Sequence, residues 1–358
     1  MISADELKNK LNIYASNKEP FLFGIDYEMS QGFFIEKPLE QKEILWRVPG
    51  VSNYEAQDKT VNLKKIENKS SKFLNLKDSK NRLLKFKDNN ETLYTKSKAR
   101  KFISLNITFE EYKKKFNIIQ YHLKRGDSFL TNLTVKTEIE TDYSFREIFE
   151  RSNSPYALLI PNKLVCFSPE IFVKIKNGKI SSNPMKGTID AKIPNAKNII
   201  MADYKETSEH YTVVDLIRND LNIVSKNVKV DKLRYCDKLH TSRGDILQIS
   251  SLISGDYNNQ KLGDAIFKLL PAGSISGAPK PATLSSIKEA EIIPRGFYSG
   301  VFGYFDGESL DTAVMIRYIE KENNKLFFRS GGGITINSDC KDEYNEVIEK
   351  IYLPFDNK

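Results

Sequence analysis

The chain has 358 residues, of which 40% are hydrophobic and 28% are charged. This composition is typical of a globular protein with a sizeable core, and it excludes a chain that is disordered throughout. The net charge of +8 comes from 55 basic and 47 acidic residues. Lysines are spread along the sequence without a basic, aromatic-rich binding module, so a nucleic-acid-binding protein is not expected.

The cysteines give no sign of a disulfide framework or a metal site. Cys166, Cys236 and Cys340 are far apart and odd in number, and they form no metal-binding spacing with histidine. The N-terminus lacks the apolar segment of a signal peptide, and no apolar stretch is long enough to span a bilayer. We therefore expect a cytoplasmic protein that does not bind membranes.

The first half of the chain predicts a mixture of helices and strands. Residues 1–20 are expected to form a short helix and a loop, followed by a buried strand over residues 21–27. Residues 54–105 are expected to form amphipathic strands and loops. A helix is predicted over residues 108–125, with Thr108 as its N-cap, and a strand over residues 128–135 follows Gly126.

Strands and helices alternate in the second half. Asn177-Gly178 predicts a two-residue hairpin turn after the strand Ile171–Lys176. Thr207 or Ser208 is expected to cap a helix over residues 207–223. Further strands are expected over residues 156–160, 163–168, 300–305, 312–319 and 326–328, and further helices over residues 261–270, 279–290 and 339–351. No low-complexity linker divides the chain, which favours one large α+β unit.

Charged residues near the C-terminus have two interpretations. Glu343, Glu346 and Lys350 are spaced so that they share one face of the last predicted helix. Spacing alone favours a solvated face with pairing of Glu346 and Lys350. Two carboxylates for a hard cation, with a lysine for an anionic group, are the functional alternative. Glu209 has a similar ambiguity, because an acidic residue near a helix start is stabilised by the helix dipole.

Three segments are rich in small residues: PMKGT (184–188), PAGSISGAPK (271–280) and SGGGI (330–334). Each alone is explained by a tight turn at the end of an element. Together they predict a backbone-lined pocket for a small anionic ligand. None matches a nucleotide-binding loop, and the sequence has no nucleophile-elbow motif for a hydrolase.

The order of these segments resembles the chorismate-utilising enzymes. The resemblance rests on eight segments: SPE (168–170), PMKGT (184–188), the stretch from Glu209 to Leu221, PAGSISGAPK (271–280), RGFYSG (295–300), MIR (315–317), GGGI (331–334) and EYNE (343–346). It implies an α/β sandwich of two packed antiparallel sheets with outer helices. Residues 1–105 would form a variable N-terminal part of the sandwich, and residues 106–358 the chorismate-binding catalytic region.

The resemblance also implies roles for individual residues. It implies that Mg²⁺ bridges the ring carboxylate of chorismate to Glu209 and Glu346, with Glu343 close by, and that Arg317 binds the enolpyruvyl carboxylate. Glu170 would be the acid that helps the C4 hydroxyl depart. Further pocket residues implied by the family are Thr188, Ser274, Tyr298, Gly331, Gly332, Gly333 and Lys350.

Lys186 points to one branch of the family. Members with lysine at this position form 4-amino-4-deoxychorismate from chorismate and ammonia, through attack of the lysine on C2. Such a lysine must be a neutral amine, which burial would favour. Leu130 stands where the water-adding members carry a general-base lysine, so isochorismate-type chemistry is disfavoured. Because the sequence has no glutamine amidotransferase signature, we expect ammonia from a separate glutamine amidotransferase subunit.

Two alternatives remain open. The first is an anthranilate synthase component I, which would also release pyruvate from the same substrate. The second is a non-catalytic protein that binds chorismate or tryptophan as a regulator. The following residues, retained together, argue against the second alternative: Glu170, Lys186, Glu209, Arg317, Glu343 and Glu346.

Overall fold

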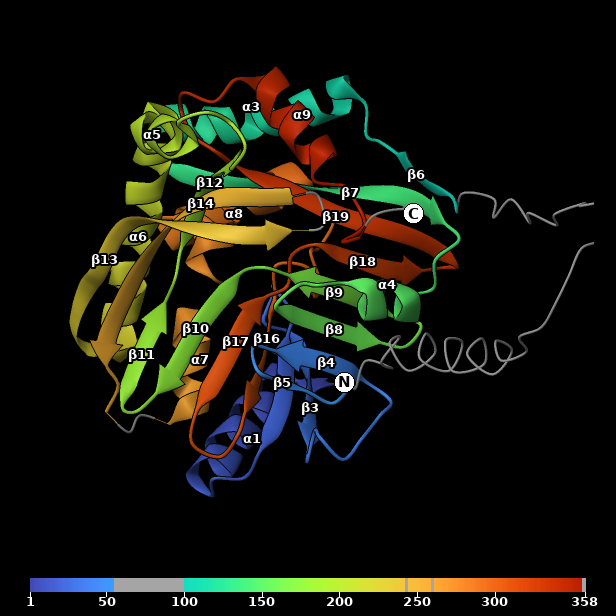
Figure 1. The fold of residues 1–358 in the computed structure, drawn as a ribbon, viewed down its shortest axis with the longest axis vertical. Helices are drawn as coiled ribbons and strands as arrows, with labels where there is room; N and C mark the ends of the chain where they lie inside the picture. The colour runs from blue at the N-terminus through green and yellow to red at the C-terminus, as the bar shows by residue number, and fades with distance from the viewer. Residues whose placement is uncertain (55–99, 242–243, 259–260, 356–358) are drawn as a thin grey trace, which may run out of the picture.

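The computed structural model describes residues 1–54, 100–241, 244–258 and 261–355 (Figure 1). Most of the expectation for residues 54–105 therefore lies outside the described residues, and only the end of this segment forms a described strand. None of the described helices is long and apolar enough to cross a lipid bilayer.

Two antiparallel sheets form the centre of the described structure. The first, here called sheet A, has ten strands in the described residues, and the hairpin β13–β14 near one end of it is long and irregular. In spatial order its strands are β1 (Ile2–Ser3), β3 (Gln31–Glu36), β2 (Phe21–Ile25), β16 (Val301–Phe305), β17 (Leu310–Val314), β10 (Ile171–Lys176), β11 (Lys179–Ser182), β14 (Gly244–Asp256) and β12 (Met185–Asp190), with β13 (Lys226–Thr241) beside β14.

Sheet B has nine strands in the described part of the chain. In spatial order they are β15 (Gly277–Ala278), β7 (Leu130–Thr141), β19 (Lys325–Ile334), β18 (Tyr318–Glu322), β9 (Leu164–Ser168), β8 (Tyr156–Ile160), β4 (Leu45–Val48) and β5 (Val51–Ser52), with β6 (Phe102–Leu105) beside β7. Because β2 pairs with β16 and β4 pairs with β8, the first fifty residues contribute strands to both sheets.

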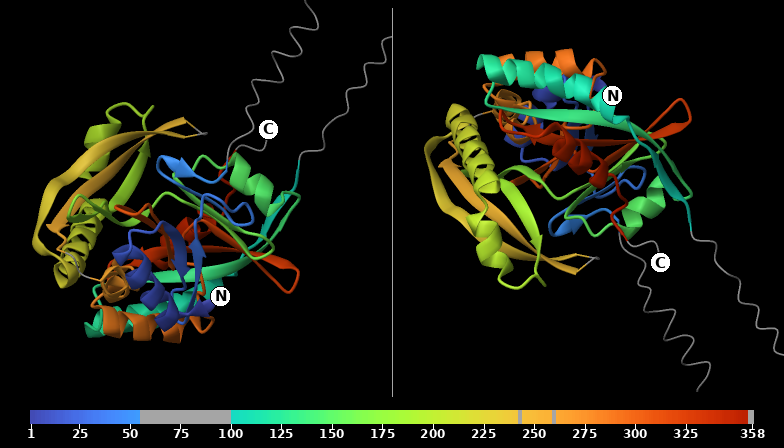
Figure 2. Two further views of the ribbon diagram at one scale, coloured as in Figure 1. Left: turned by 90° about the horizontal axis from the view of Figure 1, so that it is seen from below. Right: turned by 90° about the horizontal axis from the view of Figure 1, so that it is seen from above.

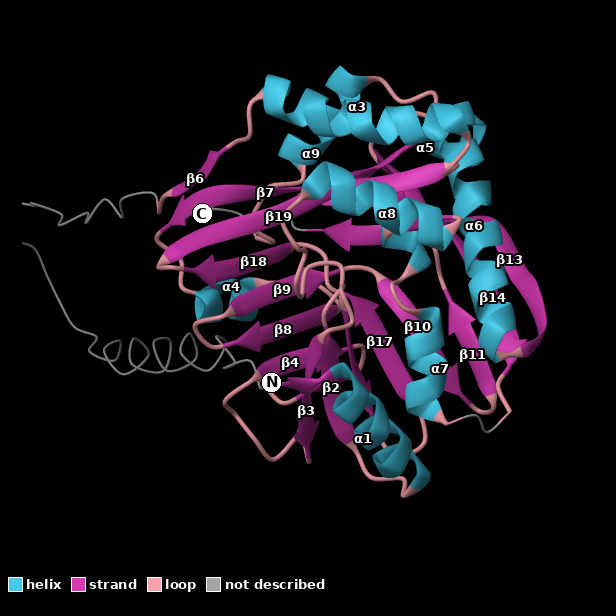
Figure 3. Cartoon of the chain, turned by 180° about the vertical axis from the view of Figure 1, so that it is seen from behind, coloured by secondary structure: helices cyan, strands magenta, loops and turns pink. Residues whose placement is uncertain are grey.

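Helices cover the outer faces of the two sheets (Figure 3). The described helices are α1 (Ala4–Ser16), α3 (Phe109–Arg125), α4 (Phe145–Arg151), α5 (Ala196–Ala202), α6 (Tyr204–Val224), α7 (Leu262–Leu269), α8 (Lys280–Glu291) and α9 (Cys340–Glu349). Helices α1, α6 and α7 share a buried apolar cluster with sheet A. Helices α3, α8 and α9 share another with sheet B, and α3 and α8 lie side by side (Figure 2).

The alternation of side chains along β2 shows how one strand serves two layers. Phe21 and Phe23 face the helices over sheet A, whereas Leu22 belongs to the cluster between the two sheets. Successive side chains of a strand point to opposite faces, so a strand buried on both sides is apolar throughout. The family's sandwich of two antiparallel sheets with outer helices is therefore confirmed.

The prediction of a single strand over residues 312–319 is wrong. The chain forms β17 in sheet A and β18 in sheet B, and it crosses between the sheets at Met315, Ile316 and Arg317. Arg317 adopts a left-handed backbone conformation at this crossing, with φ of 53°. Apolar residues flank Arg317 on both sides because both strands are buried, and no glycine or proline marks the break.

Three further boundaries differ from expectation. Helix α6 begins at Tyr204 with Asp203 as its N-cap, so Glu209 lies in the second helical turn and not at the helix start. The segments around Lys186 and Gly332 belong to strands β12 and β19, and only short loops join them to their neighbours. Glycines in these strands leave room for close approach of other groups, which is why their composition resembles that of turns.

A buried arginine ties sheet B to the loop that precedes β15. Arg295 is 1% exposed, and its guanidinium makes two hydrogen bonds to Glu291, of 2.6 and 2.9 Å. It also donates to the carbonyl oxygens of Ile275 and Asn132 at 2.8 and 2.7 Å. Glu291 in turn accepts from the backbone amide of Thr134 at 2.8 Å.

We predict that Arg295→Met lowers the free energy of unfolding by about 3–5 kcal/mol, because it leaves the buried Glu291 carboxylate without its partner. Urea unfolding measures this change. Arg146→Met is the matched control, since Arg146 and Glu150 form an ion pair of the same i,i+4 spacing with side chains 62% and 31% exposed. The control should lose less than about 0.5 kcal/mol. Equal losses in the two variants would contradict the prediction.

We also predict a pH-dependent contribution from His122. Its ring nitrogens lie 2.8 Å from Asp127 and 3.0 Å from Glu289, and the hydrogen bond to Asp127 raises the pKa of His122 above 6.5. The stabilisation that these two contacts give the folded protein is therefore complete below the ordinary pKa of histidine. It is lost as the pH rises through the higher pKa of His122 in the folded state. The difference in unfolding midpoint between the wild type and His122→Gln should shrink from about pH 5.5 to about pH 8.5. A difference that grows over this range would overturn the assignment.

Candidate active site

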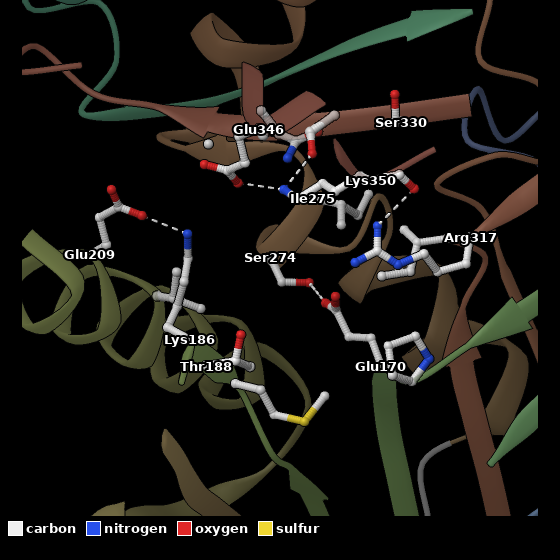
Figure 4. A pocket seen from close by; sticks show the side chains of 18 of the residues that line it. Glu170, Lys186, Thr188, Glu209, Ser274, Ile275, Arg317, Ser330, Glu346 and Lys350 are labelled. Atoms are coloured by element: carbon white, nitrogen blue, oxygen red, sulfur yellow. Dashed lines mark hydrogen bonds and ion pairs between the residues drawn. The ribbon is translucent and has the colours of Figure 1, made fainter. Parts of the chain in front are cut away.

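A cavity of about 690 Å³ lies between the ends of the two sheets. Its walls come from β12, α6, β19, α9, the turn at Ser274 and the crossing at Arg317. Figure 4 shows that charged side chains from these elements point into the same space. The segments rich in small residues thus meet around one pocket, although they are far apart in the sequence.

Lys186 enters the cavity from β12. The strand has a bulge at Gly187, where the pairing with β14 shifts by one residue and φ is 76°. A side chain at Gly187 would lie 3.2 Å from the Glu206 carboxylate, so the bulge requires glycine. The Lys186 amine lies 2.6 Å from Glu209 Oε2, and the Glu209 side chain is 8% exposed.

The ion pair with Glu209 determines the protonation state of Lys186. Burial lowers the pKa of Lys186, but the charge and hydrogen bond of Glu209, together with the charges of Glu206 and Glu346, leave the pKa above its ordinary value. In this arrangement the neighbouring carboxylates favour the ammonium form of Lys186, so burial alone does not supply the neutral amine that attack requires.

Glu170 faces the same cavity from the loop after β9. Ser274 Oγ donates a hydrogen bond of 2.5 Å to Glu170 Oε1. Burial raises the pKa of Glu170, while Ser274 and the cations Lys186, Lys350 and Arg317 act in the opposite direction. A carboxyl group with a raised pKa is suited to donate a proton near neutral pH.

Arg317 presents its guanidinium at the opposite side of the cavity from Lys186. Its Nε is buried and has no hydrogen-bond partner among the described residues. The guanidinium lies over the Tyr352 ring at 5.2 Å, and the buried Tyr298 also lines the cavity. A buried donor without a partner is costly unless a ligand satisfies it, so this position fits a carboxylate of the ligand.

The glycines of β19 bring the strand backbone to the cavity wall. A side chain at Gly333 would lie 3.7 Å from the Lys186 amine, and one at Gly332 would lie 3.4 Å from Glu343 Oε2 and 3.6 Å from Glu346 Oε1. Lys350 donates to the Gly331 carbonyl at 2.8 Å and to Glu346 at 2.5 Å. Burial lowers the pKa of Lys350 against the effect of Glu346.

Carboxylates from two helices face the cavity. Glu209 comes from α6 and Glu346 from α9, and Figure 4 shows each of them joined to a lysine. Glu343 lies behind Glu346, is 1% exposed and accepts a hydrogen bond of 2.8 Å from Ser338. No group of three His, Cys, Asp or Glu side chains in the described ranges is close enough to hold a metal ion by itself. Carboxylate oxygens are nevertheless the ligands that Mg²⁺ accepts while it keeps several waters.

Glu206 and Gln248 are among the cavity residues that sequence reasoning missed. Glu206 precedes Glu209 by three positions, which is the same spacing as Glu343 and Glu346, and this repeated spacing could have revealed it. Gln248 lies opposite Thr188 in the pairing of β12 and β14, and no local signal marks it. Of the candidate residues, all except Glu343 line the cavity, and Leu130 lines it as well.

The chain is similar to known proteins over most of its length. The profile of the chorismate binding enzyme family matches residues 2–355. An uncharacterized PabA-like protein of Haemophilus influenzae is 49% identical over 251 residues, which cover 69% of this chain and 76% of that protein. Aminodeoxychorismate synthase component 1 of Bacillus subtilis is 30% identical over 250 residues, which cover 65% of this chain and 52% of that protein.

The fold also matches solved structures. The crystal structure of anthranilate synthase component I from Streptococcus pneumoniae superposes with a TM-score of 0.63 at 22% identity, covering 92% of this chain and 79% of that one. The match of the family profile to nearly the whole chain shows that the protein belongs to the chorismate binding enzyme family.

Proposed function

We propose that the enzyme converts chorismate and ammonia into 4-amino-4-deoxychorismate and water. The observation that carries this proposal is the Lys186 amine, which reaches into the cavity toward Glu209 and the Gly333 backbone. An amine in this position can attack the ring of a bound chorismate. The name of the Bacillus subtilis relative agrees with the proposal, although other relatives are anthranilate synthases.

The reaction is written in two balanced steps. The Lys186 nitrogen bonds to C2 of chorismate, the two ring double bonds shift, and the C4–O bond breaks as Glu170 donates its proton, which releases water. Ammonia then bonds to C4, the double bonds shift back, and the Lys186 amine leaves. The proton released by the incoming nitrogen returns to Glu170. Attack requires a neutral Lys186, so its ion pair with Glu209 must break first.

The remaining cavity residues bind and orient the substrate. Arg317, whose Nε has no hydrogen-bond partner among the described residues, would bind the enolpyruvyl carboxylate, which a guanidinium can bind in a bidentate manner. The backbone of Gly331–Gly333, together with Thr188, Ser274, Tyr298 and Lys350, surrounds the ring. Leu130 is aliphatic and cannot activate a water, which disfavours addition of water in place of ammonia.

We further propose that Mg²⁺ is the cofactor. Glu209 and Glu346 would hold it directly, and Glu206 and Glu343 would hold its waters. Bound there, the cation would neutralise the ring carboxylate of chorismate. The cation and Lys186 would compete for the Glu209 carboxylate. Binding of the cation would therefore release Lys186 from its ion pair. Ammonia would come from a separate glutamine amidotransferase subunit.

We predict that Lys186→Ala lowers turnover by orders of magnitude while chorismate affinity, measured by calorimetry with Mg²⁺, changes little. Lys179→Ala is the control, because Lys179 of β11 is an exposed lysine paired with Asp256 of β14. Mass spectrometry of wild-type enzyme quenched with chorismate and no ammonia should show Lys186 carrying chorismate less one water. Unchanged turnover in Lys186→Ala would eliminate the covalent route.

Product analysis separates the alternatives in the same assay. The proposal expects a product that a lyase converts to p-aminobenzoate. Fluorescent anthranilate, formed with release of pyruvate, would instead identify an anthranilate synthase component I. Binding of chorismate without any turnover in the presence of Mg²⁺ and ammonium would favour a regulator.

We predict that Glu206→Gln raises the Mg²⁺ concentration needed for half-maximal activity by about tenfold or more, because a residue that orients metal-bound water contributes this much to affinity. Removal of Mg²⁺ with a chelator should abolish turnover and weaken chorismate binding measured by calorimetry. Asp215→Asn is the control, since Asp215 lies on the exposed side of α6 and pairs with Arg218. An Mg²⁺ requirement equal to that of the control would contradict the assignment of Glu206.

A further inference from the structure

A second charged pair lies close to the active site without lining its cavity. Asp220 of α6 and Lys280 at the start of α8 form an ion pair of 2.9 Å, with side chains only 14% and 18% exposed. Removing two charges from water is unfavourable unless they are well paired, so a largely buried pair outside the cavity calls for an explanation.

The Asp220–Lys280 ion pair lies against the loop that joins α7 to α8. Lys280 Nζ also donates to the Leu269 carbonyl at the end of α7, at 2.8 Å. The chain between these contacts contains the short 3₁₀ turn Gly273–Ile275, which carries Ser274. Asp220 and Lys280 thus connect α6 to both ends of the loop.

Gly273 shows that Asp220 packs directly on this loop. A side chain at Gly273 would lie 2.8 Å from Asp220 Oδ2 and 3.0 Å from Leu216. The next residue, Ser274, donates to Glu170 Oε1 at 2.5 Å (Figure 4). The path from Asp220 to the proposed proton donor is therefore the loop backbone at Gly273 followed by one hydrogen bond.

The groups also surround one small space. A cavity of about 20 Å³, with room for about one water molecule, is lined by Glu170, Asp220, Gly273 and Ser274 together with Ser182 and apolar side chains. Movement of the loop would open or close this space and alter the direction of Ser274 Oγ.

We propose that the Asp220–Lys280 ion pair positions Glu170. The ion pair holds the turn at Gly273, so that Ser274 Oγ donates its hydrogen bond to Glu170 Oε1 and Glu170 Oε2 faces the substrate. This inference rests on the proposed function, because it assumes that Glu170 transfers a proton. Asp220 is a positioning residue, since it acts through Ser274.

Helix α6 gives the arrangement its rigidity. Asp220 follows Glu209 by eleven positions, which is close to three helical turns, so both residues lie on one face of α6. The helix therefore supports the Lys186 side of the cavity through Glu209 and the Glu170 side through Asp220.

A double-mutant cycle tests the proposal. Asp220→Asn should lower kcat by about 10- to 100-fold and leave the KM for chorismate nearly unchanged, because a misplaced proton donor affects the reaction more than binding. Ser274→Ala should have a similar effect. The combined variant should be no slower than Ser274→Ala alone, because both changes break the same path. Effects that multiply in the combined variant would overturn the proposal.

Two further variants distinguish a positioning role of Asp220 from a general loss of structure. Asp215→Asn makes the same chemical change on the exposed side of α6 and should leave kcat at the wild-type value. Asp220→Asn/Lys280→Met removes both charges, so no unpaired charge is left buried. The proposal expects kcat to stay low in this variant, and recovery of wild-type kcat would overturn it.

Hydrogen exchange tests, without any assay of activity, whether the Asp220–Lys280 ion pair holds the turn at Gly273. The amides of residues 272–276 should exchange faster in Asp220→Asn than in the wild type or in Asp215→Asn. Unchanged exchange would overturn the inference even if the proposed function holds. A wild type that forms no 4-amino-4-deoxychorismate would instead refute the proposed function, and the exchange result would still decide whether Asp220 holds the loop.

Discussion

The contact between Lys186 and Glu209 is the interaction on which the cavity depends. Burying two charges is tolerated only when they are paired, so β12 and α6 must be held at a separation that keeps the two side chains 2.6 Å apart. The bulge at Gly187 directs β12 toward the helix, and the apolar face of α6 packs on sheet A. Much of the second half of the fold serves to keep these two elements in register.

The cations of the cavity are not equivalent. Lys186 and Lys350 each have a carboxylate partner, whereas Arg317 Nε has none in the described structure. Arg317 Nη1 donates to the Lys350 carbonyl at 3.5 Å, so a ligand carboxylate can bind at Nε without breaking an ion pair. Before Lys186 or Lys350 can contact the ligand, its ion pair with Glu209 or Glu346 must break, and another cation must then neutralise that carboxylate. In the proposed mechanism, recognition of the ligand at Arg317 is therefore separate from activation of the amine at Lys186.

The motifs predicted much of the fold and the cavity because their order along the chain is specific. They could not locate the crossing at Arg317, since two buried strands joined without a glycine or proline read as one apolar run. They also could not give the protonation state of Lys186, which depends on the position of Glu209 in space. Gln248 was missed because only the pairing of β12 with β14 brings it beside Thr188.

The N-terminal strands also support the cavity, at a distance from its chemistry. Glu28, which follows β2, accepts hydrogen bonds from the backbone amides of Arg295 and Gly296, and the Tyr27 ring lies 4.4 Å from the Arg295 guanidinium. Arg295 in turn holds the carbonyl groups of Asn132 and Ile275, two residues of the cavity wall. Because these contacts link Glu28 and Tyr27 to Arg295, and Arg295 to the wall, a change in the loop after β2 is expected to alter the hydrogen bonding of the wall itself. Sequence variation in the N-terminal part is therefore constrained wherever that part meets Arg295.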